Sequence, residues 1–135
     1  MYYGFEMHLT AKDLRIGNYI NYESTTHVVS EIKFDKLVHY WLSYKNDGYV
    51  TTYESILPIP LSKRELECLG FIEDSEDDKV YRIENSKFYV EEYKEEDYYL
   101  CYNNSKGVKM VITPISLVHE FQNIFFDLTK IELEY

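Results

Sequence analysis

Aromatic and cationic side chains that suit nucleotide recognition are concentrated between residues 15 and 44. A tyrosine or tryptophan ring offers a rigid face on which a base can stack, and a lysine or arginine can neutralise a phosphate. Fifteen tyrosines and one tryptophan are more than a core of this size requires. The candidate ligand-binding residues of this region are Arg15, His27, Lys33, Lys36, His39, Tyr40, Trp41 and Tyr44. The alternative is a tyrosine-rich sheet with ordinary cross-strand aromatic pairs.

A second group of candidates lies in residues 114–128, which have the spacing of a helix. Six apolar side chains recur at the period of one buried helical face: Leu117, Val118, Phe121, Ile124, Phe125 and Leu128. On the flank of this face, His119, Gln122 and Asn123 are further candidate ligand-binding residues. The alternative is that these polar groups only hold the helix against a neighbouring strand.

Motifs of enzyme chemistry are missing from the sequence. It contains no glycine-rich phosphate loop, no Gly-x-Ser-x-Gly, no His-Glu-x-x-His and no Asp-x-Asp-x-Asp metal loop. The four histidines, at positions 8, 27, 39 and 119, and the many carboxylates could meet only through the fold. We therefore expect a protein that is not an enzyme and has no catalytic residues, metal or cofactor.

The net charge of −10 is distributed unevenly along the chain. Residues 1–60 carry five Lys and Arg against seven Asp and Glu, a net charge of −2, so the other 75 residues carry −8. Acidic runs such as Glu91-Glu92 and Glu95-Glu96-Asp97 repel phosphate backbones and anionic lipids, so we expect neither duplex nucleic acid nor a membrane as partner. The acidic surface is either a solvated face or an imitation of nucleic acid.

Length and cysteine usage indicate one cytoplasmic domain. The 135 residues divide into an N-terminal β subdomain (1–57), a linker and helix (58–70) and a β-meander plus helix (71–135). Cys68 and Cys101 are isolated in apolar surroundings, so we expect two reduced, buried thiols and the cytoplasm of a bacterial host. Neither a signal peptide nor a stretch of about 18 apolar residues is present, so neither secretion nor membrane insertion is expected.

Turn and capping signals predict the N-terminal elements. Thr10 can cap a short helical turn, and Gly17-Asn18 leads into a strand over residues 19–22. Alternating patterns predict strands over 27–34 and 37–44, joined by a turn at Asp35-Lys36, with His39 and Trp41 on one face. Asn46-Asp47-Gly48 predicts a second turn before a strand over 49–53.

The remaining elements follow from similar signals. Pro58 and Pro60 predict an extended linker, and Ser62 begins a helix with Glu65 in a capping box and an end at Gly70. A four-stranded meander is expected over 80–84, 87–93, 98–103 and 108–112, and then Thr113 caps the last helix with Pro114 at its first position. The fold class is α+β: a small, bent antiparallel N-terminal sheet, a short middle helix, a four-stranded antiparallel meander and a C-terminal amphipathic helix packed on a sheet.

Three blocks of the sequence carry a family resemblance. They read KDLRIGNYI (residues 12–20), ILPIPLSKRELECLGF (56–71) and LVHEFQNIFFDLTKIELE (117–134). Together they resemble a family of small, mostly uncharacterised proteins from phages and mobile elements of gut-type Bacteroidetes. Ser62 stands where that family has Thr, and Lys130 where it has Gly. The resemblance implies an accessory role in a mobile element, and it implies no activity or catalytic residue.

Three functions from different classes follow. The first is a non-catalytic protein that sequesters a small nucleotide-like molecule, such as a host immune signal, and so silences defence. The second is an inhibitor of a host defence protein or nuclease that acts through an acidic, nucleic-acid-mimicking face. The third is a structural phage protein without a ligand. Exposed aromatic strands also favour self-association, so we expect a homo-oligomer.

Overall fold

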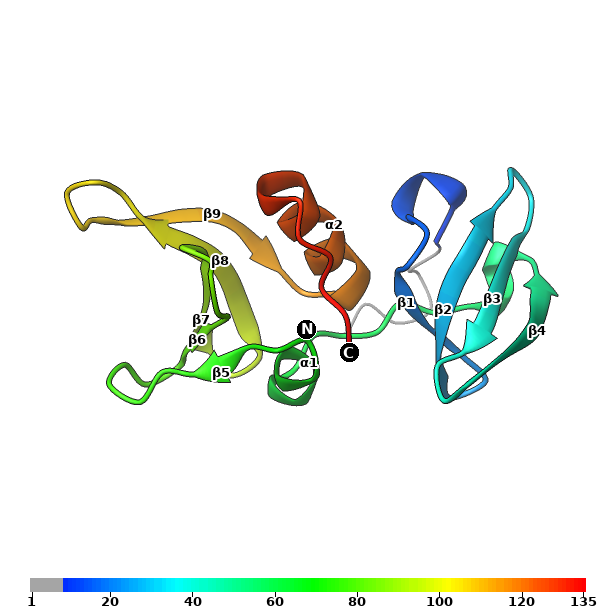
Figure 1. Ribbon diagram of the computed structural model, residues 1–135, viewed down its shortest axis with the longest axis horizontal. Coiled ribbons are helices and arrows are strands. Elements are labelled where there is room, and N and C mark those ends of the chain that lie inside the picture. The colour runs from blue at the N-terminus through cyan, green and yellow to red at the C-terminus, as the bar shows by residue number, and fades with distance from the viewer. Residues whose placement is uncertain (1–8) are drawn as a thin grey trace. The chain divides into compact units, whose positions relative to one another are not determined.

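Two compact units make up the chain in the computed structural model, which describes residues 9–135 without the side chains of residues 46 and 47. His8 lies outside the described residues. One unit holds the chain up to Ile59 together with Leu117–Asn123, and the other holds Pro60–Ser116 and Ile124–Tyr135. The boundary falls between Pro58 and Pro60, the two prolines that predict an extended linker. Each unit is built on its own antiparallel sheet, and the fold is α+β as expected (Figure 1).

The N-terminal sheet has four strands in sequence order: β1 (Tyr19–Tyr22), β2 (Thr25–Ile32), β3 (Leu37–Trp41) and β4 (Tyr44–Thr51). It is preceded by the 3₁₀ turn η2 (Ala11–Asp13), where Thr10 and Asp13 form the capping box that the sequence suggests. A second 3₁₀ turn, η3 (Tyr53–Ser55), follows β4. A core cluster of this unit contains Leu9, Leu14, Ile20, Val29, Leu37, Tyr53 and Ile56.

Both predicted turns of this sheet lie elsewhere. Ile32 pairs with Leu37 and the Lys33 amide donates to the Lys36 carbonyl, so the bend centres on Phe34-Asp35 rather than Asp35-Lys36. The prediction of a turn at residues 46–48 is also wrong, because β4 runs through them and the chain turns between Trp41 and Tyr44. Gly48, with a φ of +87°, instead forms part of an irregularity within β4.

Helix α1 (Lys63–Cys68) begins and ends where local signals predict. The Ser62 hydroxyl accepts a hydrogen bond from the Glu65 amide, whereas the Glu65 carboxylate accepts one from the Tyr135 hydroxyl. At the other end, the Phe71 amide donates to the Leu66 carbonyl and the Gly70 amide to the Glu67 carbonyl, with Gly70 at a φ of +98°. Capping therefore fixes this short helix at both ends.

The second sheet is the expected meander, with one more short strand before it. Its order is β5 (Ile72–Glu73), β6 (Val80–Arg82), β7 (Tyr89–Lys94), β8 (Asp97–Asn103) and β9 (Lys109–Ile115). One face carries Tyr81, Val90 and Leu100, which are buried and pair across neighbouring strands. The other face carries a smaller buried cluster of Val80, Tyr89 and Cys101.

Helix α2 (Val118–Thr129) starts four residues later than predicted. Thr113 does not cap it, and Pro114 does not begin it, because both residues belong to β9, where they pair with Leu100 and Tyr99. The amphipathic pattern itself is confirmed, since Phe121 and Phe125 are fully buried. Phe125 packs against Phe71 and Phe88 of its own unit, at ring-centroid distances of 5.8 and 6.5 Å.

The two cysteines differ in environment. Cys101 is fully buried, and burial raises the pKa of its thiol. The expectation that Cys68 is buried is wrong, because α1 buries Leu66 and Leu69 and leaves Cys68 exposed. Over residues 9–135, no helix has the length and apolar character needed to cross a membrane.

Candidate functional site

A cleft of about 310 Å³ lies on the N-terminal sheet beside Tyr40. Val28 and Tyr40 pair directly across β2 and β3, so both project from the same face of the sheet. The other lining residues are Ile16, Gly17, Val29, Ser30, Lys45 and Gly48. The cleft therefore combines an aromatic ring, a cation, a hydroxyl and glycine backbone.

Strand β3 pairs irregularly with both of its neighbours, β2 and β4, beside the cleft. The register of β2 against β3 shifts between Val29 and Glu31, and there the Ser30 hydroxyl donates to the Val38 carbonyl at 3.1 Å. On the other side, the register of β4 shifts opposite Tyr40. A Cβ at Gly48 would lie 3.2 Å from the His39 carbonyl oxygen, and the φ of +87° strains any residue with a side chain, so this position favours glycine. Such bulges often lie next to binding sites, where they redirect side chains.

The cation of the cleft lies over its aromatic ring. The Lys45 Nζ is 5.2 Å from the centre of the Tyr40 ring, which is within the range of a cation–π interaction. Lys45 is exposed and Tyr40 is half-buried, so a ligand can reach both. Lys45 is not among the binding residues predicted from the sequence, and its place over Tyr40 depends on the irregular pairing of β4 with β3.

The other predicted aromatic and cationic residues lie at different places. Lys33 and Lys36 are exposed in the bend between β2 and β3. Trp41 and Tyr44, with 41% and 61% of their surface exposed, form the last pair before the turn into β4. Tyr40 is the one predicted binding residue that lines the cleft.

His27 and His39 form a buried pair on the opposite face of the sheet. Their Nδ1 atoms are 2.8 Å apart, so one ring carries a proton on Nδ1 and the other accepts it. Their Nε2 atoms lie 3.1 and 3.0 Å from the hydroxyls of Thr25 and Thr51. His39 and Trp41 pair with Val29 and His27 of β2 in regular register, so they lie on one face of β3 as predicted; His39 is buried, whereas Trp41, the last residue of β3, is exposed.

Aromatic rings enclose the histidine pair, and burial keeps it neutral. The ring of Tyr22 lies edge-on to both imidazoles, and the Tyr49 ring stacks on His39 at 5.7 Å. Burial, together with a smaller contribution from the neighbouring His27, lowers the pKa of His39 to about 4. Burial also lowers the pKa of His27, which the Glu23 carboxylate partly offsets. The pair is therefore suited to packing rather than to binding an anion at neutral pH.

Gln122 and Asn123 serve as hydrogen-bonding partners of the chain before β1. Gln122 Oε1 accepts from the Tyr19 amide at 2.9 Å, and its Nε2 donates to the Gly17 carbonyl at 3.1 Å. Asn123 Oδ1 accepts from Asn18 Nδ2 at 2.8 Å and from Arg15 Nη1 at 3.1 Å. The expected flank of the last helix exists, and these polar groups are used inside the N-terminal unit.

His119, on the same flank, is also buried. Burial lowers the pKa of this imidazole to about 4, and the nearby Asp13 partly offsets the effect. Its Nδ1 is a buried polar atom without a hydrogen-bonding partner among the described residues. His119 is thus neutral at physiological pH.

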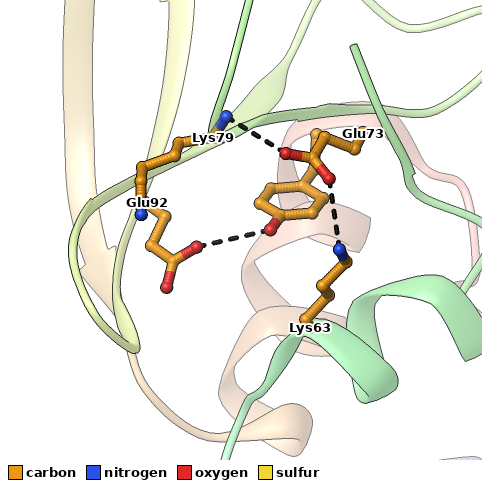
Figure 2. Close-up of polar contacts among 5 residues, drawn as sticks. Lys63, Glu73, Lys79 and Glu92 are labelled. Carbon is orange, nitrogen blue, oxygen red and sulfur yellow. Dashed lines mark hydrogen bonds and ion pairs between the residues drawn. The ribbon is translucent and has the colours of Figure 1, made fainter. Parts of the chain in front are cut away.

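A polar cluster in the second unit joins α1 to the meander (Figure 2). Glu73 accepts hydrogen bonds from the Lys63 ammonium at 3.2 Å and the Lys79 amide at 3.4 Å, and the pKa of this carboxyl is lowered mainly by Lys63. The Tyr81 hydroxyl donates to Glu92 at 3.3 Å, and burial raises the pKa of Tyr81 to about 12. Glu73 therefore stays ionised and Tyr81 stays neutral near neutral pH, which suits a structural role.

Comparison of the chain with known protein families, with curated proteins and with solved structures finds no match.

Proposed function

We propose that this protein is a non-enzymatic binding protein that captures a small nucleotide-like molecule in the cleft formed by Tyr40 and Lys45. The observation that supports it is the position of the Lys45 ammonium 5.2 Å above the Tyr40 ring, inside a cleft. An aromatic face can stack with a base, and the adjacent cation can pair with a phosphate.

Size and polarity narrow the ligand class. The volume of about 310 Å³ is at the lower end of the ~300–1,000 Å³ typical of small-molecule sites, which favours one nucleotide unit over a long oligonucleotide. The single lysine in the lining suits one or two phosphate charges. The Ser30 hydroxyl can accept a further hydrogen bond, because its proton is directed to the Val38 carbonyl.

The biological role that we propose is the removal of a host immune signal. The resemblance of three sequence blocks to phage and mobile-element proteins favours an accessory function in which a ligand is held and not converted. A protein of this kind acts by stoichiometric binding, so its effect depends on its concentration relative to that of the signal. Capture would keep the signal away from its receptor.

The test begins with native mass spectrometry of the protein after exposure to lysate from defence-activated cells. Calorimetry with a panel of cyclic and ADP-ribose-type nucleotides follows. A bound mass that is released unchanged on denaturation supports capture and identifies the ligand. If neither experiment detects a nucleotide-like ligand at millimolar concentration, the proposal is wrong.

A matched pair of charge reversals tests the location of the site. Lys45→Glu should abolish nucleotide binding, because it places a carboxylate where the phosphate would lie. Lys87→Glu is the control, since Lys87 also lies over aromatic rings, 5.4 Å from those of Phe88 and Tyr102, but in the other unit. Both changes alter the net charge equally. Equal loss of binding in the two variants would contradict the assignment of the cleft.

A further inference from the structure

A groove of about 240 Å³ lies on the outer face of the second sheet. It is lined by Glu91 and Tyr93 of β7, Tyr99 of β8, and Lys109 and Val111 of β9. Glu91 pairs directly with Tyr99, so both project from this face. Tyr93 is two positions from Glu91 on β7, beside a register shift between Glu92 and Lys94, and it lines the groove with Glu91.

Two tyrosine rings at right angles form a corner of this groove. The Tyr93 and Tyr99 rings are 6.4 Å apart with an interplanar angle of 88°. Tyr93 has 71% of its surface exposed, and Val111 has 55%. The face of a tyrosine ring is electronegative and attracts a cation, and rings that meet at an angle can contact one ammonium or guanidinium from two sides.

The charges around the corner match a positive ligand. The Glu91 carboxylate holds the Lys109 ammonium at 2.7 Å, so the groove already places a cation beside its aromatic walls. Both partners are partly exposed, and a pair of this kind exchanges readily for another cation. The unit that contains the groove has nine Lys and Arg against sixteen Asp and Glu, a net charge of −7. This field attracts basic partners and accelerates their association.

We infer that the Tyr93–Tyr99 corner binds a lysine or arginine side chain of a partner protein, within a basic segment that lies across β7, β8 and β9. The partner is a protein because the groove combines apolar surface, from Val111 and the tyrosine rings, with one carboxylate, Glu91, whose present partner Lys109 an incoming cation would replace. Free inorganic cations would gain nothing from the apolar part. The Tyr40–Lys45 cleft is in the other unit, so this surface is independent of nucleotide capture.

Fluorescence anisotropy with the full chain tests the inference. The probe is a labelled peptide of alternating lysine and serine, and the reference is the same peptide with glutamate in place of lysine. Tyr93→Ala should weaken binding of the lysine peptide about fivefold, which corresponds to about 1 kcal/mol. The matched control is Tyr44→Ala, which removes a similarly exposed tyrosine, at 61%, from the other unit and should leave affinity unchanged.

Two further measurements separate the corner from general acidity. Tetramethylammonium should displace the lysine peptide at concentrations where sodium does not. The reason is that an aromatic corner attracts a quaternary ammonium, whereas a carboxylate alone does not distinguish tetramethylammonium from sodium. The double change Glu95→Gln, Glu96→Gln should slow association but keep the effect of Tyr93→Ala. The inference is overturned if Tyr93→Ala and Tyr44→Ala bind equally well or if the glutamate peptide binds as tightly. Light scattering at increasing protein concentration detects self-association of the chain. If binding of the lysine peptide disappears as the chain self-associates, the groove binds a second copy, and the inference is also overturned.

Discussion

Acidification should destabilise the N-terminal unit through the His27–His39 pair. The pKa of His39 is 6.5 in a solvated chain and about 4 in the folded protein, mainly because of burial. A lowered pKa means that the unfolded chain binds a proton more readily than the folded one. The stability that the neutral pair contributes is therefore present above about pH 6.5 and is lost as the pH falls toward 4.

The size of the effect follows from the two pKa values. A tenfold difference in proton affinity corresponds to about 1.4 kcal/mol, so the full difference between the two pKa values of His39 would reach roughly 3 kcal/mol. Between about pH 7 and pH 4.5, the linkage relation gives a loss of roughly 2 kcal/mol from His39 alone. If both Nδ1 atoms carried a proton, two N–H groups would face each other 2.8 Å apart. Protonation of His27 in place of His39 is therefore also unfavourable in the folded protein.

Urea unfolding at a series of pH values, followed by the fluorescence of Trp41, measures this effect. Trp41 is the single tryptophan and pairs with His27 across β2 and β3, so its signal reports on this unit. The comparison variant is His39→Gln, which cannot titrate but keeps a donor and an acceptor. Carboxylates contribute equally to both proteins, so the difference between their stabilities isolates the imidazole. Parallel curves for the two proteins between about pH 7 and pH 4.5 would refute the reasoning.

Two further predictions concern single side chains. Gln122→Leu should lower the free energy of unfolding by roughly 2–4 kcal/mol, because the Tyr19 amide and the Gly17 carbonyl lose a buried hydrogen-bonding partner. As a control, Asp127→Asn changes an exposed residue and should lower the free energy of unfolding by under about 0.5 kcal/mol in the same urea titration. A thiol reagent such as dithionitrobenzoate should modify Cys68 rapidly and Cys101 only after urea is added, because Cys101 is fully buried and its pKa is raised. Two thiols reacting at one rate in the native protein would contradict the second prediction.

Elements fixed by neighbouring residues could be predicted from the sequence. The Ser62 cap, the end of α1 at Gly70 and the capping box of Thr10 all depend on hydrogen bonds between residues at most a few positions apart. Where pairing with a strand distant in the sequence determines the structure, local signals predict the wrong element. Pro114 resembles the first residue of a helix, yet its place opposite Tyr99 keeps it in β9. Likewise, the signal at residues 46–48 marks an irregularity in β4, because β3 pairs on both sides of it.

Only part of the candidate site could be predicted from the sequence. Tyr40 is among the residues named from the sequence and lines the cleft, whereas the lysines named with it, Lys33 and Lys36, lie in the bend between β2 and β3. The sequence gives no sign that Lys45 returns over Tyr40, since this depends on the register shift in β4. The partners of Gln122 lie more than 100 positions away, so its hydrogen bonds with Tyr19 and Gly17 could not be read from its spacing in the helix.

The position of Pro114 also affects whether further strands can add to the edge of the second sheet. In the part of the chain that the structure describes, β9 has a paired strand on one side only, and Val108, Met110 and Val111 are exposed along it. An apolar strand of this kind can template the addition of further strands and lead to fibrils. Pro114 has no backbone N–H to offer to a new strand, and Lys106 and Lys109 add charges that repel an identical copy. The same proline that resembles a helix start therefore acts as a barrier to amyloid-like stacking.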